Sequence, residues 1–304
     1  MMPRAAVSLL LGLAFLSSGA LAAQETPGAV TRDPPLDTLH PPSQVVVAIP
    51  SHGVGLNGFL YLPQGTGRHR VVVLLHGYPG VEKDLDLAQA LRRAGYAVLY
   101  FDYRGSWGTG GTFSYGNAIV DAASALAWVR SPSVAGRYGL ELERLSVIGH
   151  SFGGWLALVT AAADPAVTCV AAFAPGDRAA QTRTWQSRPA ERAAMRASLA
   201  QTMDSQSGPI RARPGDVLRE LEAHAESWAL ASQAPHLRDR PLLLVTGKRD
   251  TPHMVVRDTL LAALQRAGAA HVRDVVLDDD HTFSAHRIGT AQLVVDWLGQ
   301  DCAR

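Results

Sequence analysis

Three residues whose side chains could together cleave a carbonyl bond follow separate apolar runs of this sequence: Ser151, Asp250 and His281. A serine hydroxyl is a weak nucleophile at neutral pH, so it needs a histidine to take its proton and a carboxylate to hold that histidine. Ser151 lies in Gly149-His150-Ser151-Phe152-Gly153, the G-x-S-x-G pattern of a sharp turn between a strand and a helix. Catalytic triads of this kind occur in several chain orders, and Ser, Asp, His is the order expected of one of them. These residues predict acyl transfer by a serine nucleophile.

The acid and the base each have competing interpretations. Asp250 precedes Thr251-Pro252, so its carboxylate could instead cap the helix that we expect from Met254. One carboxylate of Asp278 to Asp280 could also replace it, although that run is more simply a solvated loop. His281 is the preferred base because it follows the last predicted strand. The competing histidines lie beside the acid, at the start of a strand and near the final helix, and they are His253, His271 and His286.

Two backbone N–H groups are expected to form the oxyanion hole. One belongs to Phe152, the residue after the nucleophile, and the other should come from the loop after the first parallel strand. That loop reads His76-Gly77-Tyr78-Pro79-Gly80, which points to the N–H of Tyr78. A simple Pro-Gly turn does not require His-Gly before it. The side chain of Tyr78 is also a candidate to line the pocket.

Short apolar runs that alternate with helix-like segments predict the α/β class, with a mostly parallel eight-stranded sheet and helices on both faces. The first two strands flank a turn at residues 51–55 and should form an antiparallel hairpin. Ligands of such sheets bind at the carboxyl ends of the strands. The expected strands are residues 44–49, 56–62, 71–75, 97–101, 145–148, 168–173, 242–245 and 272–277, and the expected helices are 85–94, 117–130, 152–163 and 254–267.

Residues 174–241 break this alternation, because they contain no good strand. Helix-like segments occur at 190–203 and 217–231. Since a structureless loop of this length is improbable in a compact domain, we expect a helical cap at about residues 176–240.

The start of the chain is typical of a secretory signal peptide, which we assign to residues 1–22. Arg4 gives a basic start, residues 5–16 are apolar, and Ala20-Leu21-Ala22 offers a cleavage site. Residues 23–43 then read as a flexible leader and residues 44–301 as one domain. No later apolar run is long enough to span a bilayer, so we expect an exported protein, periplasmic or secreted, with no membrane span in the mature chain.

Composition argues against several classes of partner. The net charge is +1, with charges of both signs interspersed, so nothing indicates binding to nucleic acid. We expect no metal, because no Cys/His cluster appears, and no nucleotide cofactor, because the glycines of residues 105–111 lack the phosphate-loop spacing.

Cys169 in an apolar run is most simply a small buried residue, and Cys302 lies in the C-terminal tail. An oxidising compartment permits a bond between them, but the sequence leaves their pairing open.

With these residues in view, residues 44–298 resemble the α/β-hydrolase family. The resemblance rests on the elbow at residues 149–154, on His76-Gly77-Tyr78-Pro79-Gly80, on Asp250 and on Asp280-His281-Thr282-Phe283. Asp102-Tyr103-Arg104-Gly105-Ser106, followed by Trp107-Gly108, is similar to the strand-end loop of one branch. That branch contains prolyl-oligopeptidase-like, dipeptidyl-aminopeptidase-like and acylaminoacyl-peptidase-like hydrolases and many esterases. No β-propeller precedes the domain in this sequence, and the long cap is similar to that of monomeric aminopeptidase and esterase relatives.

The resemblance implies a serine hydrolase that acts on a small molecule. A carboxylic ester is the leading substrate class, and a short peptide or aminoacyl amide is second because the chemistry is shared. An acyltransferase that excludes water from the acyl-enzyme stays open. A hydrolase-fold binding protein without catalysis also stays open, although the presence of Ser151, Asp250 and His281 in order argues against it. The sequence leaves the oligomeric state open.

Overall fold

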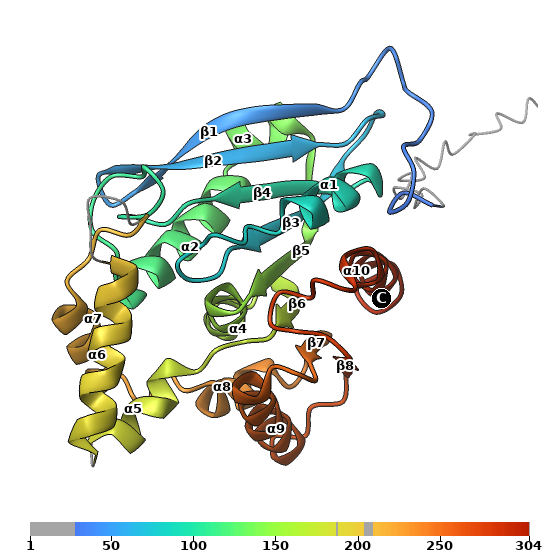
Figure 1. The fold of residues 1–304 in the computed structure, drawn as a ribbon. Coiled ribbons are helices and arrows are strands. Elements are labelled where there is room, and N and C mark those ends of the chain that lie inside the picture. The colour runs from blue at the N-terminus through green and yellow to red at the C-terminus, as the bar shows by residue number, and fades with distance from the viewer. Residues whose placement is uncertain (1–27, 187, 204–208, 304) are drawn as a thin grey trace, which may run out of the picture.

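An eight-stranded mixed sheet forms the centre of the computed structural model, which describes residues 28–186, 188–203 and 209–303 (Figure 1). The strands are β1 (Ser43–Ser51), β2 (Val54–Leu62), β3 (His69–Leu75), β4 (Ala97–Phe101), β5 (Leu140–His150), β6 (Val167–Phe173), β7 (Leu242–Gly247) and β8 (Val272–Leu277). Their order in the sheet is β1-β2-β4-β3-β5-β6-β7-β8. β1 and β2 pair antiparallel, as do β2 and β4, and all other neighbours are parallel. The predicted α/β class and mostly parallel eight-stranded sheet are therefore confirmed.

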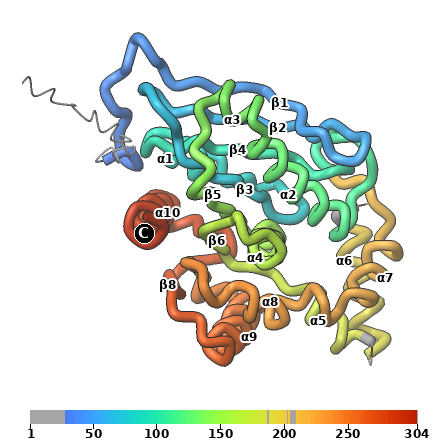
Figure 2. The backbone as a smooth tube through the Cα atoms, turned by 180° about the vertical axis from the view of Figure 1, so that it is seen from behind, coloured from blue at the N-terminus to red at the C-terminus, as the bar shows by residue number. Residues whose placement is uncertain are grey.

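Helices cover both faces of this sheet, as Figures 1 and 2 show from opposite sides. One face carries α1 (Leu85–Arg93) and α10 (Arg287–Gln300), which pack on each other. The other face carries α2 (Tyr115–Arg130), α3 (Pro132–Tyr138), α4 (Phe152–Ala163), α8 (Leu230–Leu237) and α9 (Thr251–Arg266). The buried apolar side chains accordingly form two clusters, one on each side of the sheet.

Two helices differ from the sequence prediction for reasons of capping. Helix α2 begins two residues earlier than expected because the Ser114 hydroxyl accepts a hydrogen bond from the N–H of Asn117. Helix α2 ends at Arg130, as expected, and Pro132 then opens α3, where the first turn needs no N–H from it. Helix α3 buries no residue, so it lacks the apolar periodicity that would have predicted it.

Four helices, α5 (Arg178–Gln186), α6 (Pro189–Met203), α7 (Pro214–Ala223) and α8, lie between β6 and β7, where a helical cap is predicted (Figure 1). The helix expected at 217–231 is divided into α7 and α8 because Trp228 turns inward between them. Its carbonyl oxygen accepts a hydrogen bond from the indole N–H of Trp155, and its ring stacks on Tyr115. A tertiary contact thus overrides the local helical pattern.

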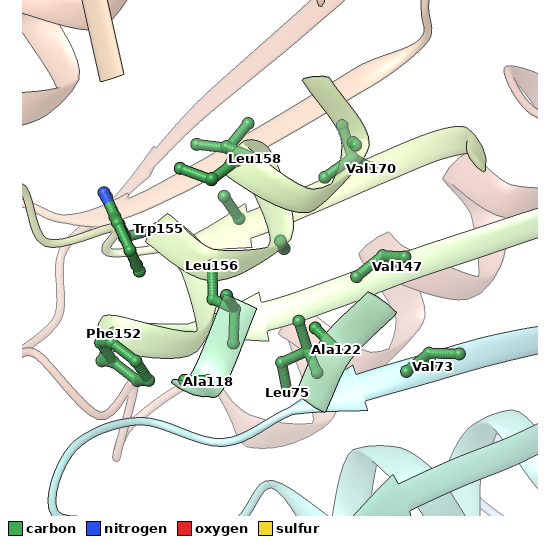
Figure 3. Packing of buried hydrophobic residues seen from close by; sticks show 14 of the residues in the cluster. Val73, Leu75, Ala118, Ala122, Val147, Phe152, Trp155, Leu156, Leu158 and Val170 are labelled. Atoms are coloured by element: carbon green, nitrogen blue, oxygen red, sulfur yellow. The ribbon is translucent and has the colours of Figure 1, made fainter. Parts of the chain in front are cut away.

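Helix α4 packs at the centre of the larger apolar cluster (Figure 3). Leu156 of this helix points toward Ala118 and Ala122, two small residues of α2, and the buried Trp155 packs against the rings of Tyr115 and Phe152. Burial of each large apolar side chain contributes roughly 1.5–3 kcal/mol. The helix that follows Ser151 is therefore held rigidly against both the sheet and α2.

The ends of the described chain are tied to the domain. The predicted signal peptide and the first residues of the predicted leader lie outside the described residues. In the described part of the leader, Ala29 and Val30 are buried, and Arg93 donates a hydrogen bond to the Ala29 carbonyl at 2.7 Å. Cys302, beyond α10, forms a disulfide with Cys169 of β6, which resolves the pairing that the sequence left open. Among residues 28–303 that are described, no helix is both long and apolar enough to cross a bilayer.

Candidate active site

Ser151 occupies the turn between β5 and α4 with backbone angles of φ 57° and ψ −115°, a sparsely populated region for a residue with a side chain. The glycines around it are required by close backbone contacts. A Cβ at Gly149 would lie 2.0 Å from the carbonyl oxygen of Gly153, and a Cβ at Gly153 would lie 2.0 Å from that of Leu75. The pentapeptide thus forms the strained elbow that exposes a serine side chain at the carboxyl edge of a sheet.

Ser151, His281 and Asp250 come together at this edge in one line of hydrogen bonds. The Ser151 Oγ lies 3.0 Å from Nε2 of His281, and Nδ1 of His281 lies 2.6 Å from Oδ2 of Asp250. Asp250 stands immediately before α9, but its carboxylate makes no capping hydrogen bond to that helix. Since Nδ1–H of His281 donates to the carboxylate, Nε2 is left to accept the serine proton. The arrangement can therefore deprotonate the Ser151 hydroxyl.

Asp250 receives a second hydrogen bond, from His253 one turn along α9. Nδ1 of His253 lies 2.7 Å from Oδ1, the carboxylate oxygen that His281 does not use. Burial alone would raise the pKa of Asp250, but the hydrogen bonds and charges of His253 and His281 outweigh it and hold this pKa well below its usual range. Asp250 is consequently ionised throughout the physiological range of pH.

The other acids and histidines considered in the sequence do not join this line of hydrogen bonds. Asp279 is fully buried rather than solvated, because it accepts hydrogen bonds from the N–H groups of Asp280 and Ala285 and from Nδ1 of His286. Asp280 accepts from the N–H groups of Thr282 and Ser284, and His271 is exposed before β8, at the opposite edge of the sheet. These acids shape the loop that presents His281.

His150 also positions this loop, a role that the sequence analysis did not assign. Its Nε2–H donates to the carbonyl oxygen of His281 at 2.8 Å, and the two rings lie 4.8 Å apart. Burial lowers the pKa of His150 to about 4, so the ring stays neutral at physiological pH. Its position directly before Ser151 is the only sequence signal for this contact.

The loop after β3 lies directly against the elbow, as predicted for the second oxyanion donor. A Cβ placed at Gly77 would be 3.3 Å from Cβ of Ser151, a tight contact that a larger residue could make only if the elbow shifted by a few tenths of an ångström. The carbonyl of His76 accepts a hydrogen bond from the Tyr103 hydroxyl at 2.9 Å, which holds the loop in place. The N–H of Phe152 belongs to the first turn of α4, where N–H groups lack an acceptor within the helix. Both predicted donors, Tyr78 and Phe152, thus lie beside the nucleophile.

The loop at Asp102–Ser106 is fixed to α2 and lies next to the chain that leads to the cap. Arg104 forms an ion pair with the buried Asp121 at 2.7 Å and also donates its backbone N–H to it. Gly105 has φ +72°, and a Cβ there would lie 2.1 Å from the N atom of Phe113. The N–H of Phe113 in turn donates to the carbonyl of Arg211 in the cap, so this loop connects the sheet to the cap.

A cavity of about 300 Å³ opens beside Ser151 and His281. Its walls combine aromatic rings of the main domain with side chains of the cap, and the residues that line it include Tyr78, Tyr115, Phe152, Trp155, Arg178 and Met195. Glu220 of α7 holds the cap over this wall, because its carboxylate accepts hydrogen bonds from the Ser114 hydroxyl and from the N–H groups of Tyr115 and Gly116. Neither Arg178 nor Glu220 was singled out from the sequence, since nothing local marks them as facing the site.

Two groups of side chains in the described parts of the chain place possible metal-ligand atoms within 4.8 Å of one another. In the first group, both carboxylate oxygens of Asp250 already accept imidazole N–H groups. In the second, formed by Glu82, Asp84 and Asp86, the guanidinium of Arg287 supplies the positive charge. The carboxylates of both groups thus already have positively polarised partners within this chain.

Comparison with known proteins identifies the relatives of this chain. A model of the Alpha/beta hydrolase family matches residues 72–296. An uncharacterized 31.7 kDa protein of Escherichia coli, from the traX-finO intergenic region, is 31% identical over 135 residues, which are 42% of this chain and 45% of that protein. An uncharacterized protein of Mycobacterium tuberculosis is 28% identical over 138 residues, 45% of this chain and 47% of its own length. The chain thus matches just under half the length of these curated relatives.

Solved structures with the same fold include enzymes of several activities. A dienelactone hydrolase from Anabaena variabilis has a TM-score of 0.56 at 21% identity, with 86% of this chain and 98% of that chain covered. An esterase from Pyrococcus furiosus has a TM-score of 0.60 at 18% identity, covering 89% and 98%. An acylaminoacyl peptidase from Pyrococcus horikoshii has a TM-score of 0.62 at 15% identity, covering 86% and 42%. At these identities the likeness shows the fold alone.

Proposed function

Because the chain belongs to the α/β-hydrolase family, we propose that it is a serine hydrolase that cleaves carboxylic esters through an acyl-enzyme. The observation that carries the proposal is the unbroken line of hydrogen bonds from Ser151 Oγ through His281 to Asp250, at 3.0 and 2.6 Å. It starts at a strained elbow whose glycines admit no side chain. Such strain persists where function requires it, because it must be offset by the surrounding packing.

In the proposed reaction, His281 Nε2 takes the proton of Ser151 as Oγ attacks the ester carbonyl. The oxyanion that forms is stabilised by the N–H groups of Phe152 and Tyr78. The intermediate collapses as His281 returns the proton to the departing alcohol, which leaves an acyl group on Ser151. The same histidine then takes a proton from a water molecule as the water attacks the acyl group, and it returns this proton to Ser151 Oγ as the bond to the acyl carbon breaks and the acid is released. Asp250 holds His281 in the required tautomer throughout.

We also propose that the mature protein acts outside the cytoplasm. The expectation of a signal peptide at residues 1–22 motivates this proposal, and the disulfide between Cys169 and Cys302 supports it, because such bonds persist in oxidising compartments. Fractionation of expressing cells, with blotting for the protein, tests the proposal. Retention of an uncleaved chain in the cytoplasm would contradict it.

The test of catalysis compares the purified protein with a Ser151→Ala variant. We expect a fluorophosphonate probe to label the natural protein and not the variant, and hydrolysis of 4-nitrophenyl butyrate to fall by about 10³-fold or more in the variant. Equal labelling of both proteins, or of neither, would rule out the proposed nucleophile. An alanyl anilide measured beside the ester distinguishes an esterase from a peptidase, and we expect the ester to be the better substrate.

A further inference from the structure

One cationic side chain of the cap faces the cavity beside Ser151. Arg178 begins α5 and is the only Lys or Arg among the described residues that line this cavity. Its Nη1 donates to the thioether sulfur of Met195 at 2.8 Å, and its guanidinium carbon lies 6.0 Å from the ring centroid of Tyr78. A thioether is a weak acceptor and an aromatic ring carries no net charge, so these contacts place the guanidinium without neutralising it.

Carboxylates near Arg178 along the chain are engaged elsewhere. Asp177 uses one oxygen to accept the N–H of Ala180 at 3.0 Å and the other to accept the N–H of Leu230 at 2.9 Å, so it joins the starts of α5 and α8. Within the described parts of the chain, no carboxylate lies within 4.0 Å of the Arg178 guanidinium nitrogens, the limit for an ion pair. By contrast, Arg183 on the same helix pairs with Glu226 at 2.8 Å.

The surroundings of Arg178 favour an anion of a particular kind. A guanidinium presents a planar fork of N–H donors that matches the two oxygens of a carboxylate. Its attraction for such a group is stronger beside the rings of Tyr78, Tyr115 and Trp155 than in open water, because the local dielectric constant is lower. The same rings offer an apolar surface to the part of a ligand that joins the carboxylate to the reacting carbonyl.

We propose that the substrates of this enzyme are esters or lactones that carry a free carboxylate, which Arg178 binds while Ser151 attacks the ester carbonyl. The inference rests on the proposed function of Ser151 and adds the substrate class to it. Arg178 acts by binding, so it contributes to the choice of substrate and takes no part in proton transfer. The cap, which supplies this residue, thereby sets the specificity of the site.

The experiment measures kcat/KM for matched pairs of esters that differ only in charge. 4-Nitrophenyl hydrogen terephthalate and 4-nitrophenyl 4-carbamoylbenzoate test an acyl carboxylate, and 4-carboxyphenyl butyrate and 4-carbamoylphenyl butyrate test one on the alcohol. Each rate is divided by the rate of alkaline hydrolysis of the same ester, to remove intrinsic reactivity. We expect a preference for the carboxylate of about 10- to 100-fold in at least one pair, the scale of a hydrogen bond to a charged group.

Variants assign the preference to Arg178. We expect Arg178→Gln to abolish it and Arg178→Lys, which keeps the charge but not the planar fork, to retain part of it. Arg183→Gln is the matched control, since Arg183 lies on the same helix, is exposed and does not line the cavity, and it should keep the full preference. Fluorophosphonate labelling of each variant shows that it is folded.

Each outcome decides the question. Equal rates for charged and neutral esters in both pairs, or a preference that survives in labelled Arg178→Gln, would overturn the inference and leave the proposed hydrolase function standing. Absence of labelling at Ser151 in the natural protein, with no hydrolysis of any ester, would instead overturn the proposed function itself. A preference that Arg178→Gln removes and Arg183→Gln retains supports both.

Discussion

The imidazole rings of His253 and His281 are stacked, with their centroids 4.3 Å apart and 29° between their planes. Each ring donates a hydrogen bond to a different oxygen of the Asp250 carboxylate, at 2.7 and 2.6 Å. Rotation of this carboxylate would therefore break two hydrogen bonds instead of one. We expect His253 to position the acid that orients His281, although the sequence suggested it only as a competing base.

Replacement of His253 by Phe should separate the effect of its hydrogen bond to Asp250 from that of its stacking on His281, because Phe keeps a ring and lacks the N–H donor. We expect kcat for ester hydrolysis to fall by about tenfold, corresponding to one hydrogen bond to a charged group. Asp250→Asn should be far more damaging, at about 10⁴-fold, because it favours the wrong tautomer of His281. Steady-state kinetics across pH measure both effects. Unchanged kcat in His253→Phe would show that the hydrogen bond from this residue has no positioning role.

The elbow should tolerate no side chain at Gly153. A Cβ there would lie 2.0 Å from the Leu75 carbonyl oxygen and 2.6 Å from that of His76, so Gly153→Ala must displace either β3 or α4. We expect a loss of more than about 2 kcal/mol in the free energy of unfolding, together with loss of fluorophosphonate labelling. Gly136→Ala in the exposed helix α3 is the control, because a Cβ there meets nothing within 4 Å. Urea denaturation of both variants measures the difference, and equal stabilities would contradict the tight contact.

Glu220 should hold the cap in place through the start of α2. Its carboxylate lies at the N-terminus of that helix and accepts three hydrogen bonds there, one of them from the N–H of Tyr115 in the cavity wall. We expect Glu220→Gln to cost about 1–2 kcal/mol of unfolding free energy and to raise KM for an ester. Glu222→Gln on the same helix is the control, because Glu222 pairs with Arg192 within the cap, and it should cost less than about 1 kcal/mol. A larger KM change in the control than in Glu220→Gln would refute this account.

Acid should destabilise the protein partly through His76. Burial lowers the pKa of this residue to about 4 from its ordinary value of 6.5, although Asp102 and the Gly77 carbonyl act in the opposite direction. As the pH falls between these values, the unfolded chain gains a proton at this position that the folded protein does not bind, so stability is lost. From pH 7 to pH 5 the loss through His76 should amount to about 2 kcal/mol.

Comparison with a His76→Gln variant isolates this effect, because His150 contributes in the same direction and Asp84, whose pKa burial raises to about 6, contributes in the opposite one. The variant should lose less unfolding free energy than the natural protein when urea denaturation is repeated at pH 7 and pH 5. His236→Gln, at an exposed position on α8, should behave like the natural protein. Parallel losses in all three proteins would count against a buried neutral His76.

The disulfide should matter for stability and not for catalysis. It joins β6 to the end of α10 across a sequence separation of 133 residues, so it restricts the unfolded chain strongly. We expect the double variant Cys169→Ala, Cys302→Ser to lose about 2–5 kcal/mol of unfolding free energy while its kcat for an ester is unchanged. Thermal and urea unfolding with and without a reductant measure the loss. If reductant leaves the stability of the natural protein unaltered, the bond is absent in solution.

The sequence by itself determined the sheet and the order of the chemical groups along it. Buried parallel strands must be continuous apolar runs, and the close backbone contacts of the elbow require Gly149 and Gly153, so both features are visible in local composition. Because parallel strands end at a common edge, the positions of Ser151, Asp250 and His281 after different strands already predicted that their side chains would meet. Hydrogen bonds of 3.0 and 2.6 Å join them in the structure.

Only the tertiary structure decided which other side chains reach that edge. The bonds from His253 to Asp250 and from His150 to the His281 carbonyl depend on ring orientations that no local pattern encodes. The break between α7 and α8 arises from contacts of Trp228 with distant residues. Arg178 faces the cavity because the hydrogen bond from the N–H of Leu230 to Asp177 joins the start of α5 to the start of α8. Strand ends follow from short-range periodicity, whereas the direction of a cap side chain depends on packing between segments far apart in the chain.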